Sequence, residues 1–404
     1  MTLMTKRELF AIALCLSTAT LCTAQAFKTI ALFDGVNGES PVSSLIQGVD
    51  GNLYGTASSG GAENGGTVFE IAGGKLVALY SLCSQDSCAD GFNPEAGLVQ
   101  AANGNLYGTT FGDEFNLFGT VFEVTPGGRL ATLYTFCPQG DCANGSEPQA
   151  GLLQADDGSF YGTTVYGGAD SCGTVFEMAA GGRLITLHSF MRSDGQGPSG
   201  NLIRGSDGNI YGTTHLGGAN DYGTVFEMTA AGALLTLHSF ANTPSGAYPS
   251  AGVVQAANGN FYGTTSQGGA NNQGTVFEIT PSGRVATLYS FCAQENCVDG
   301  AGPQAGLVQA IDGNFYGTTQ SGGAYGHGAI FGITAGGKFV TLHSFCAQSG
   351  CPDGWSPLGG LLLASDGNLY GTTYSGGLSS CYDGCGTVFS LSLGLDPLMK
   401  SIYH

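Results

Sequence analysis

The chain has 404 residues and an acidic composition, with 11 Lys and Arg against 30 Asp and Glu and a formal net charge of −19. Because a surface of this sign repels other polyanions, we expect no nucleic-acid partner. Only 10% of the residues are charged and 70 are glycine, yet Leu, Val, Ile, Phe and Tyr recur at regular intervals. That pattern excludes a disordered chain and predicts a buried core.

The first 26 residues have the pattern of a secretory signal peptide. Lys6 and Arg7 precede an apolar run at residues 9–21, and Ala24-Gln25-Ala26 offers a cleavage site after Ala26. No other stretch approaches the ~20 continuous apolar residues of a membrane span. We therefore expect an exported chain with no transmembrane anchor, either secreted or located in the periplasm or at the cell surface.

One tripeptide, Tyr-Gly-Thr, divides the rest of the chain into repeats. It begins at Tyr54, Tyr107, Tyr161, Tyr211, Tyr262, Tyr316 and Tyr370, so successive copies are 50 to 54 residues apart. A period of this size is typical of solenoids, propellers and other repeat arrays.

The fifth copy shows how one repeat is built. Four runs rich in β-branched and aromatic residues, at 249–255, 261–265, 274–280 and 285–291, are separated by turn residues such as Asn258-Gly259-Asn260. Short apolar runs separated by Gly, Asn and Pro predict antiparallel strands. Each repeat is therefore expected to form one four-stranded sheet.

The turn between the first two strands recurs as Asp-Gly or Asn-Gly in every copy. Five copies carry aspartate, which could in principle bind calcium: Asp50, Asp157, Asp207, Asp312 and Asp366. Asp, Asn and Gly all tolerate the left-handed conformation of a tight hairpin turn, which accounts for these residues without a metal. We favour the turn interpretation and expect no metal there.

The two ends of the chain predict that the repeats close into a ring. The seventh copy stops after the strand at 386–391 and lacks its fourth strand, whereas residues 28–33 resemble that missing strand. Pairing the two removes the open sheet edges of an unclosed array. We predict an all-β, seven-bladed β-propeller at 27–393, with four strands per blade, closed by an N-terminal strand and followed by a tail at 394–404. A β-helix is disfavoured because its coils usually take fewer residues.

Cysteines recur in a frame of the form Cys-x-Gln-x-x-Cys-x-Asp/Asn-Gly. In an exported chain such local pairs are typical of disulfides, whereas zinc would need four ligands that converge from different repeats. We predict four framed pairs and a fifth pair of different spacing, namely Cys83 with Cys88, Cys137 with Cys142, Cys292 with Cys297, Cys346 with Cys351, and Cys381 with Cys385. Cys172 is left unpaired within the chain, either free or linked between chains.

The repeat also resembles a known family. The frame Gly-Asn-Leu-Tyr-Gly-Thr-Thr followed by Gly-Thr-Val-Phe-Glu, at 104–123 and in a related form at 313–331, is similar to the GloVer (choice-of-anchor) tandem repeat of bacterial exported proteins. The resemblance implies a secreted or surface propeller, often joined to a C-terminal anchor, and brings no catalytic residues. This chain departs from it because no anchor is recognisable in residues 392–404.

Candidate functional residues are those that interrupt the repeat in loops expected on one face. As a binding rim we select Asp113, Glu114, Tyr166, His215, Tyr222, Tyr325 and Trp355. His215, Asp221 and His327 are the alternative catalytic set, as acid–base groups or metal ligands. The simpler interpretation is that these three are solvated loop residues.

Specific enzyme motifs are missing, since the sequence has no Gly-x-Ser-x-Gly elbow and no His-Glu-x-x-His pair. The sequence leaves enzymatic activity undecided and favours a binding or scaffold propeller that recognises extracellular glycan or protein, with no cofactor. The alternative is a metal-assisted hydrolase or lyase with its site among the loops. The oligomeric state stays open.

Overall fold

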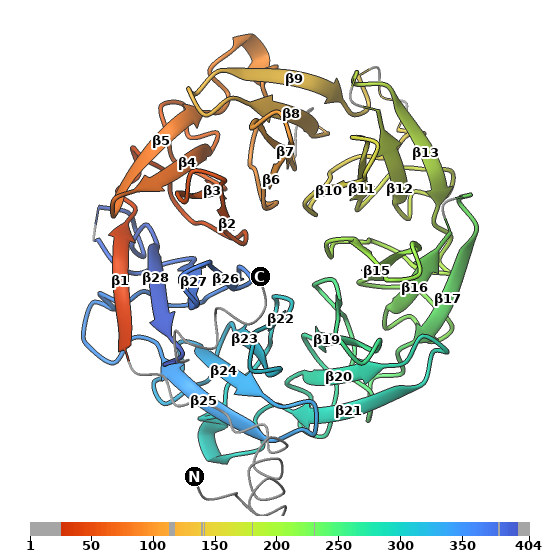
Figure 1. Cartoon of the computed structure of the whole chain (residues 1–404), viewed down its shortest axis with the longest axis vertical. Coiled ribbons are helices and arrows are strands. Elements are labelled where there is room, and N and C mark those ends of the chain that lie inside the picture. Colours follow the sequence, from red (N-terminus) through yellow and green to blue (C-terminus); the bar gives the residue numbers. More distant parts are fainter. Residues whose placement is uncertain are drawn as a thin grey trace, which may run out of the picture.

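In the computed structural model of this chain, seven four-stranded antiparallel sheets surround a central axis (Figure 1). The structure describes residues 26–394 except 113–117, 139, 141, 180, 230 and 379. Of the expected signal peptide only Ala26 is described, and residues 395–404 of the expected tail lie outside this part. We number the sheets as blades 1 to 6 in chain order, starting with β2–β5, and blade 7 consists of β26, β27, β28 and β1.

Each blade runs from a short inner strand to a long outer strand. The inner strands are β2 (Ile46–Gln47), β6 (Val99–Gln100), β10 (Leu153–Gln154), β14 (Ile203–Arg204), β18 (Val254–Gln255), β22 (Val308–Gln309) and β26 (Leu362–Leu363). The second strands are β3 (Leu53–Ala57), β7 (Leu106–Thr110), β11 (Phe160–Thr164), β15 (Ile210–Thr214), β19 (Phe261–Thr265), β23 (Phe315–Thr319) and β27 (Asn368–Thr373). The third strands are β4 (Thr67–Ala72), β8 (Thr120–Val124), β12 (Thr174–Met178), β16 (Thr224–Met228), β20 (Thr275–Ile279), β24 (Ala329–Ile333) and β28 (Thr387–Ser392). The outer strands are β5 (Lys75–Ser81), β9 (Leu130–Thr135), β13 (Leu184–Ser189), β17 (Leu234–Ser239), β21 (Val285–Ser290), β25 (Phe339–Ser344) and β1 (Ala26–Leu32). Two short 3₁₀ helices, η1 (Asp86–Cys88) and η2 (Glu295–Cys297), lie between blades.

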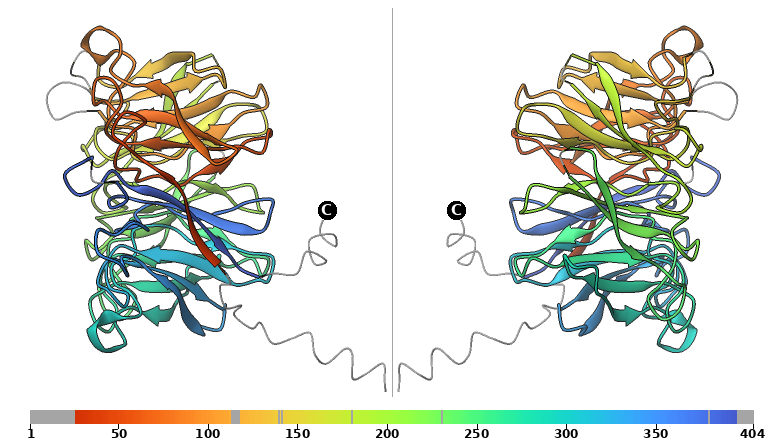
Figure 2. Two further views of the ribbon diagram at one scale, coloured as in Figure 1. Left: turned by 90° about the vertical axis from the view of Figure 1, so that its left-hand side faces the viewer. Right: turned by 90° about the vertical axis from the view of Figure 1, so that its right-hand side faces the viewer.

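The ring closes as the sequence predicts. β1 pairs antiparallel with β28, from Ala26 opposite Ser392 to Leu32 opposite Thr387, and Figure 1 shows β1 (red) at the outer edge beside β28 (blue). The all-β, seven-bladed fold with an N-terminal closing strand is therefore confirmed. Figure 2 shows the ring from the side as a thick disc.

The inner strands are shorter than the sequence suggests. Residues 249–255 were expected to form one strand, but only Val254–Gln255 pair with β19. The preceding residues turn toward the axis of the ring, and their carbonyl groups bond to the neighbouring blade instead. In blade 6, for example, the Ala305 carbonyl accepts a hydrogen bond from Thr264 of blade 5 at 2.8 Å.

The apolar core lies between the blades. Buried residues form seven clusters, each of which joins two neighbouring blades. Between blades 5 and 6, Tyr262, Val276 and Phe291 pack against Phe315 and Phe331, all with no exposed surface. The Tyr262 and Phe315 rings stack with centroids 4.1 Å apart. Both faces of each sheet are therefore covered, which explains why the strands lack polar alternation.

The glycine and threonine of Tyr-Gly-Thr hold the blades together. A Cβ on Gly263 would lie 2.6 Å from Cζ of Phe277, so only glycine lets this ring cross the strand. The Thr264 hydroxyl donates to Ala305 of the next blade. The same bond links six of the interfaces, through Thr56, Thr109, Thr213, Thr264, Thr318 and Thr372, and at the seventh Thr163 donates to the Pro198 carbonyl, two residues earlier in the equivalent segment.

The tyrosine of the motif fixes the hairpin turn that precedes it. In blade 1 the Tyr54 hydroxyl donates to Asp50 Oδ2 at 2.6 Å, and Asp50 Oδ1 accepts the backbone N–H of Asn52 at 3.1 Å. Burial and the bond to Asp50 raise the pKa of Tyr54, whereas the bond from Tyr54 lowers the pKa of Asp50. The repeated aspartate is thus used by the turn, as the sequence predicts.

Candidate functional site

The loops of the ring gather on one face, which we call the loop rim. It consists of the connections between second and third strands and those from each outer strand to the next blade. The two sets bond directly to each other: Gly168 N–H donates to the Cys142 carbonyl at 2.8 Å, and Gly323 N–H donates to the Cys297 carbonyl at 2.9 Å. The cysteine frames and the variable loops therefore share this face, as expected from the strand order.

All five predicted cysteine pairs are linked in the structure: Cys83 with Cys88, Cys137 with Cys142, Cys292 with Cys297, Cys346 with Cys351, and Cys381 with Cys385. Cys172 is free and buried. Burial raises the pKa of the Cys172 thiol, so it is held in its less reactive protonated form.

The aspartate of the cysteine frame has a structural role. Asp299 has no exposed surface and accepts hydrogen bonds from the Tyr289 hydroxyl at 2.8 Å and from the Ala293 N–H at 2.9 Å. Asp90 is bound in the same way by Tyr80 and Ser84. These carboxylates tie the disulfide loop to the outer strand and are not presented to a ligand.

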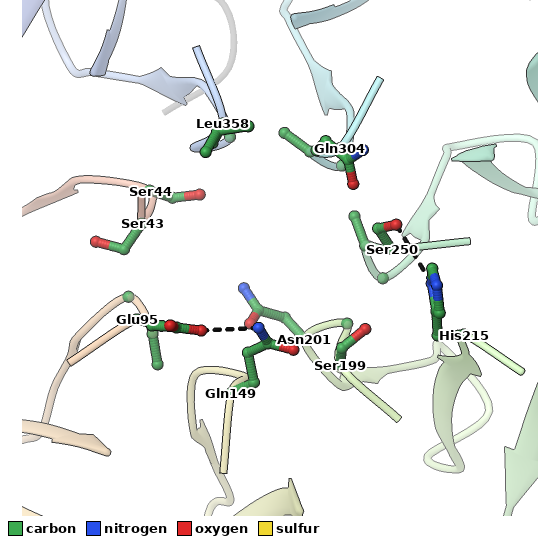
Figure 3. A pocket seen from close by; sticks show the side chains of 18 of the residues that line it. Ser43, Ser44, Glu95, Gln149, Ser199, Asn201, His215, Ser250, Gln304 and Leu358 are labelled. Carbon is green, nitrogen blue, oxygen red and sulfur yellow. Dashed lines mark hydrogen bonds between the residues drawn. The ribbon is translucent and has the colours of Figure 1, made fainter. Parts of the chain in front are cut away.

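A cavity of about 890 Å³ lies on the axis of the ring, where the blades meet. Its wall is built mainly from the segment that follows a proline before each inner strand (Figure 3). The first residue after the proline is of five different types in the seven blades: Val42, Glu95, Gln149, Ser199, Ser250, Gln304 and Leu358. The residues after it are small, which leaves the cavity open.

A repeated bend in the backbone brings these side chains to the axis. The residue before each proline is left-handed, with φ between 55° and 62°, at Ser40, Asn93, Glu147, Gly197, Tyr248, Gly302 and Ser356. Proline fixes its own φ, so the two residues together form a rigid corner. Five of these seven residues are not glycine, and such strain is tolerated where the surrounding structure enforces it.

Glu95 is the centre of a hydrogen-bond network on the cavity wall. Gln149 Nε2 donates to its Oε2 at 2.7 Å, and Asn93 Nδ2 donates to its Oε1 at 3.0 Å. On the adjacent wall, Asn201 Oδ1 accepts the Gly151 N–H at 2.8 Å. Neighbouring blades are thus connected by side-chain amides, and these amides and the carboxylate point to the same space (Figure 3).

Two residues predicted from the sequence reach this cavity. Tyr166 lies at its edge with 47% of its surface exposed, and His215 lines it with Nδ1 3.5 Å from Ser250 Oγ. Burial lowers the pKa of His215, so the ring is neutral at pH 7. Behind His215, Tyr248 packs against it and against the predicted Tyr222, with ring centroids 5.3 and 5.5 Å away.

The other predicted residues lie elsewhere on the rim. Asp221 forms an exposed ion pair with Arg192, whose Nε lies 3.0 Å from Oδ1. His327 packs edge-on against Trp355 at 5.6 Å, and Tyr325 is 52% exposed. Asp113 and Glu114 lie outside the described residues.

The alternative catalytic set is not assembled into a metal site. Among the residues that the structure describes, no three His, Cys, Asp or Glu side chains are grouped to hold a metal ion. His215 faces the axial cavity, Asp221 is engaged by Arg192, and His327 contacts Trp355. Each has a partner of its own.

The residues after the prolines were missed by the sequence analysis. Their segment was interpreted as the first strand of each blade, and none of them was selected as a candidate. A signal was present, because this position changes from Glu to Gln, Ser, Val or Leu between blades, while the following residues stay small. Variation at one position of a constant repeat is typical of a ligand-facing residue.

The fold and this site define a seven-bladed propeller with a cavity on its axis that polar and aliphatic side chains line. The chain belongs to the Gloeobacter/Verrucomicrobia repeat family, whose model matches residues 18–144, 139–310 and 293–402. The family resemblance seen in the sequence is therefore confirmed. No curated protein matches the chain significantly.

Several solved propellers share the fold at low sequence identity. A periplasmic gluconolactonase of Pseudomonas aeruginosa, PpgL, has 17% identity and a TM-score of 0.52, and the match covers 79% of this chain and 96% of that one. A putative 6-phosphogluconolactonase of Bacteroides uniformis has 17% identity and a TM-score of 0.52, with coverages of 79% and 88%. PorZ, a surface component of the type-IX secretion system of Porphyromonas gingivalis, has 13% identity and a TM-score of 0.53, with coverages of 88% and 46%. These similarities show the fold alone. Within the described part of the chain, no helix has the length and hydrophobicity needed to cross a membrane.

Proposed function

We propose that this chain is an exported binding propeller that recognises an extracellular glycan in its axial cavity. The observation that carries the proposal is the cavity of about 890 Å³ with amide and hydroxyl side chains on its wall. Its volume falls in the range of roughly 300 to 1,000 Å³ in which proteins hold small ligands. Neutral donors and acceptors such as Gln149, Asn201, Ser250 and Gln304 match the hydroxyl groups of a sugar.

A glycan fits this site better than a protein surface does. A stable protein partner buries about 800 Å² on each side and favours aromatic and Arg anchors on a broad patch. The axial cavity is concave, and its wall combines neutral polar side chains with small and aliphatic ones. Tyr166, half exposed at the edge, offers the flat apolar surface against which the C–H face of a sugar ring can pack.

Export is part of the proposal. Five local disulfides are stable in an oxidising compartment and are rare in a reducing cytosol. Fractionation of the producing cells, with mass spectrometry of the cysteine pairs, tests this directly. Recovery of the protein in the cytosol with reduced frames would contradict it.

The test of binding is a glycan array probed with the intact exported protein, followed by calorimetry with the glycan that binds. Gln304→Ala removes an amide from the cavity wall and should weaken binding about 5-fold, the equivalent of one hydrogen bond. Gln348→Ala is the matched control, since Gln348 is exposed outside the cavity. Folded protein that binds no glycan, or two variants with equal effects, would overturn the proposal. Capture of a protein partner instead would favour the alternative of protein recognition.

A further inference from the structure

The axial cavity has an uneven charge. Among the described residues that line it, Glu95 is the only Asp, Glu, Lys or Arg. The other titratable residues in this lining are Tyr166 and His215, and His215, whose pKa is lowered by burial, adds no positive charge at pH 7. The cavity therefore holds one negative charge.

The Glu95 carboxylate is held in place by neutral groups. Its two oxygens accept hydrogen bonds from Gln149 at 2.7 Å and Asn93 at 3.0 Å. The four ion pairs in the described part of the chain join other residues: His188 with Asp194, Arg192 with Asp221, Arg204 with Asp156, and His343 with Asp353. Glu95 is thus oriented without being neutralised.

The charge of Glu95 acts on a second carboxyl group, that of Glu147. The pKa of Glu147 is raised, mainly by burial and further by repulsion from Glu95. Glu147 precedes the proline of blade 3 and lies two residues before Gln149 in the sequence. The potential on this side of the cavity is therefore negative, in a molecule that is acidic overall.

We propose that the axial cavity selects a glycan with a free amino group, such as glucosamine units of a deacetylated polymer, and that Glu95 binds the ammonium group. This inference rests on the proposed glycan function and names its ligand class. An ammonium group supplies the positively charged partner that the Glu95 carboxylate lacks, and it forms charge-assisted hydrogen bonds with that carboxylate. The amide atoms that these hydrogen bonds do not use, Gln149 Oε1 and Asn201 Nδ2, are left for the sugar hydroxyls. Uronic or sialic acids meet a like charge and are rejected.

The experiment compares three oligosaccharides of equal length by calorimetry, made of glucosamine, N-acetylglucosamine or galacturonic acid. We expect the glucosamine oligomer to bind at least 10-fold more tightly than the acetylated one, since a hydrogen bond to a charged group is worth about 1.5 to 3 kcal/mol, or ~10-fold to 100-fold. Binding of the galacturonic acid oligomer should be undetectable.

Glu95→Gln should remove this preference, so that the glucosamine and acetylated oligomers bind with affinities equal within about 2-fold. The matched control is Glu63→Gln, which makes the same change of net charge on an exposed loop of blade 1. If Glu95→Gln unfolds, Glu95→Ser provides the second variant, because blades 4 and 5 carry Ser199 and Ser250 at this position.

The outcomes separate this inference from the proposed function. Equal binding of the glucosamine and acetylated oligomers would overturn the amino-sugar preference while leaving glycan binding intact. Equal loss of the preference in Glu95→Gln and Glu63→Gln would assign it to overall charge and overturn the role of Glu95. Absence of binding to these oligomers and to every glycan on the array would overturn both proposals.

Discussion

Replacing two threonines by valine tests whether the threonine hydrogen bond stabilises the closing interface between blades 7 and 1 as it stabilises an interface elsewhere in the ring. Thr264 Oγ1 donates to the Ala305 carbonyl at 2.8 Å between blades 5 and 6, and Thr372 Oγ1 donates to the Ser43 carbonyl at 3.3 Å between blades 7 and 1. Both threonines are 1% exposed. Valine keeps the shape but leaves a buried carbonyl without this donor, which costs about 1 to 3 kcal/mol. We expect Thr264→Val to lower the free energy of unfolding by an amount in the middle of that range. Thr372→Val should lower it by an amount near the lower end, because the hydrogen bond of Thr372 is longer.

The assay is equilibrium urea unfolding of the oxidised protein, followed by circular dichroism. Thr341→Val on β25 is the control, because the side chain of Thr341 makes no hydrogen bond within the described part of the chain; a change within ~0.5 kcal/mol is expected. The two core variants should add within ~0.5 kcal/mol when combined, since they act at separate interfaces. If Thr372→Val matches the control while Thr264→Val is destabilised, the closing interface is not engaged in solution. If both match the control, the bond between blades contributes nothing.

Three further perturbations test packing, the disulfides and pH dependence. Gly263→Ala introduces a methyl group against a buried phenyl ring and should cost about 1 to 3 kcal/mol in urea unfolding, whereas Gly181→Ala has open space and should be neutral; equal effects would contradict the packing reason. Joint replacement of Cys292 and Cys297 by Ser should lower the free energy of unfolding by roughly 2 kcal/mol or less, and mass spectrometry should find the other pairs linked. Loss of the folded ring would show that the cysteine frame does more than restrain its loop. Burial lowers the pKa of His238, so the unfolded chain binds a proton at this residue more readily than the folded chain does. The buried neutral imidazole therefore favours the folded state fully above about pH 6.5, and stability falls as the pH drops below that value. His238→Phe should therefore lose less stability than the wild type between pH 7.5 and 5, and parallel pH profiles would refute this assignment.

The fold was predictable because its determinants are local and repeated seven times. Turn residues, strand length and the circular offset of residues 28–33 each indicate the same closed ring, and β1 pairs with β28 accordingly. The ring of Phe277, which crosses the glycine of Tyr-Gly-Thr in blade 5, could be identified only in three dimensions.

The site was predictable only in part, because it is made by convergence. His215 and Tyr166 were found as departures from the repeat, whereas Glu95 and Gln149 sit in segments that have the apolar pattern of strands. What turns these segments toward the axis is a left-handed residue before each proline, including Glu147, a residue type that does not favour this conformation. Tertiary bonds enforce it, such as that from the Glu147 N–H to the Phe118 carbonyl at 2.8 Å. The local sequence pattern does not predict such a bend.

Constant and variable positions of the repeat therefore have separate tasks. The threonine and glycine of Tyr-Gly-Thr stabilise the interfaces between blades, and they are the same in every copy. The residue after the proline faces the cavity and can change without loss of those bonds, as Glu95, Ser199 and Leu358 show in three blades. Because a carboxylate stands at only one of the seven positions, the cavity has one negative side although the scaffold is nearly symmetric. Under the amino-glycan proposal, a ligand with a single positive group would be held off the axis and in one orientation, which a fully symmetric ring could not impose.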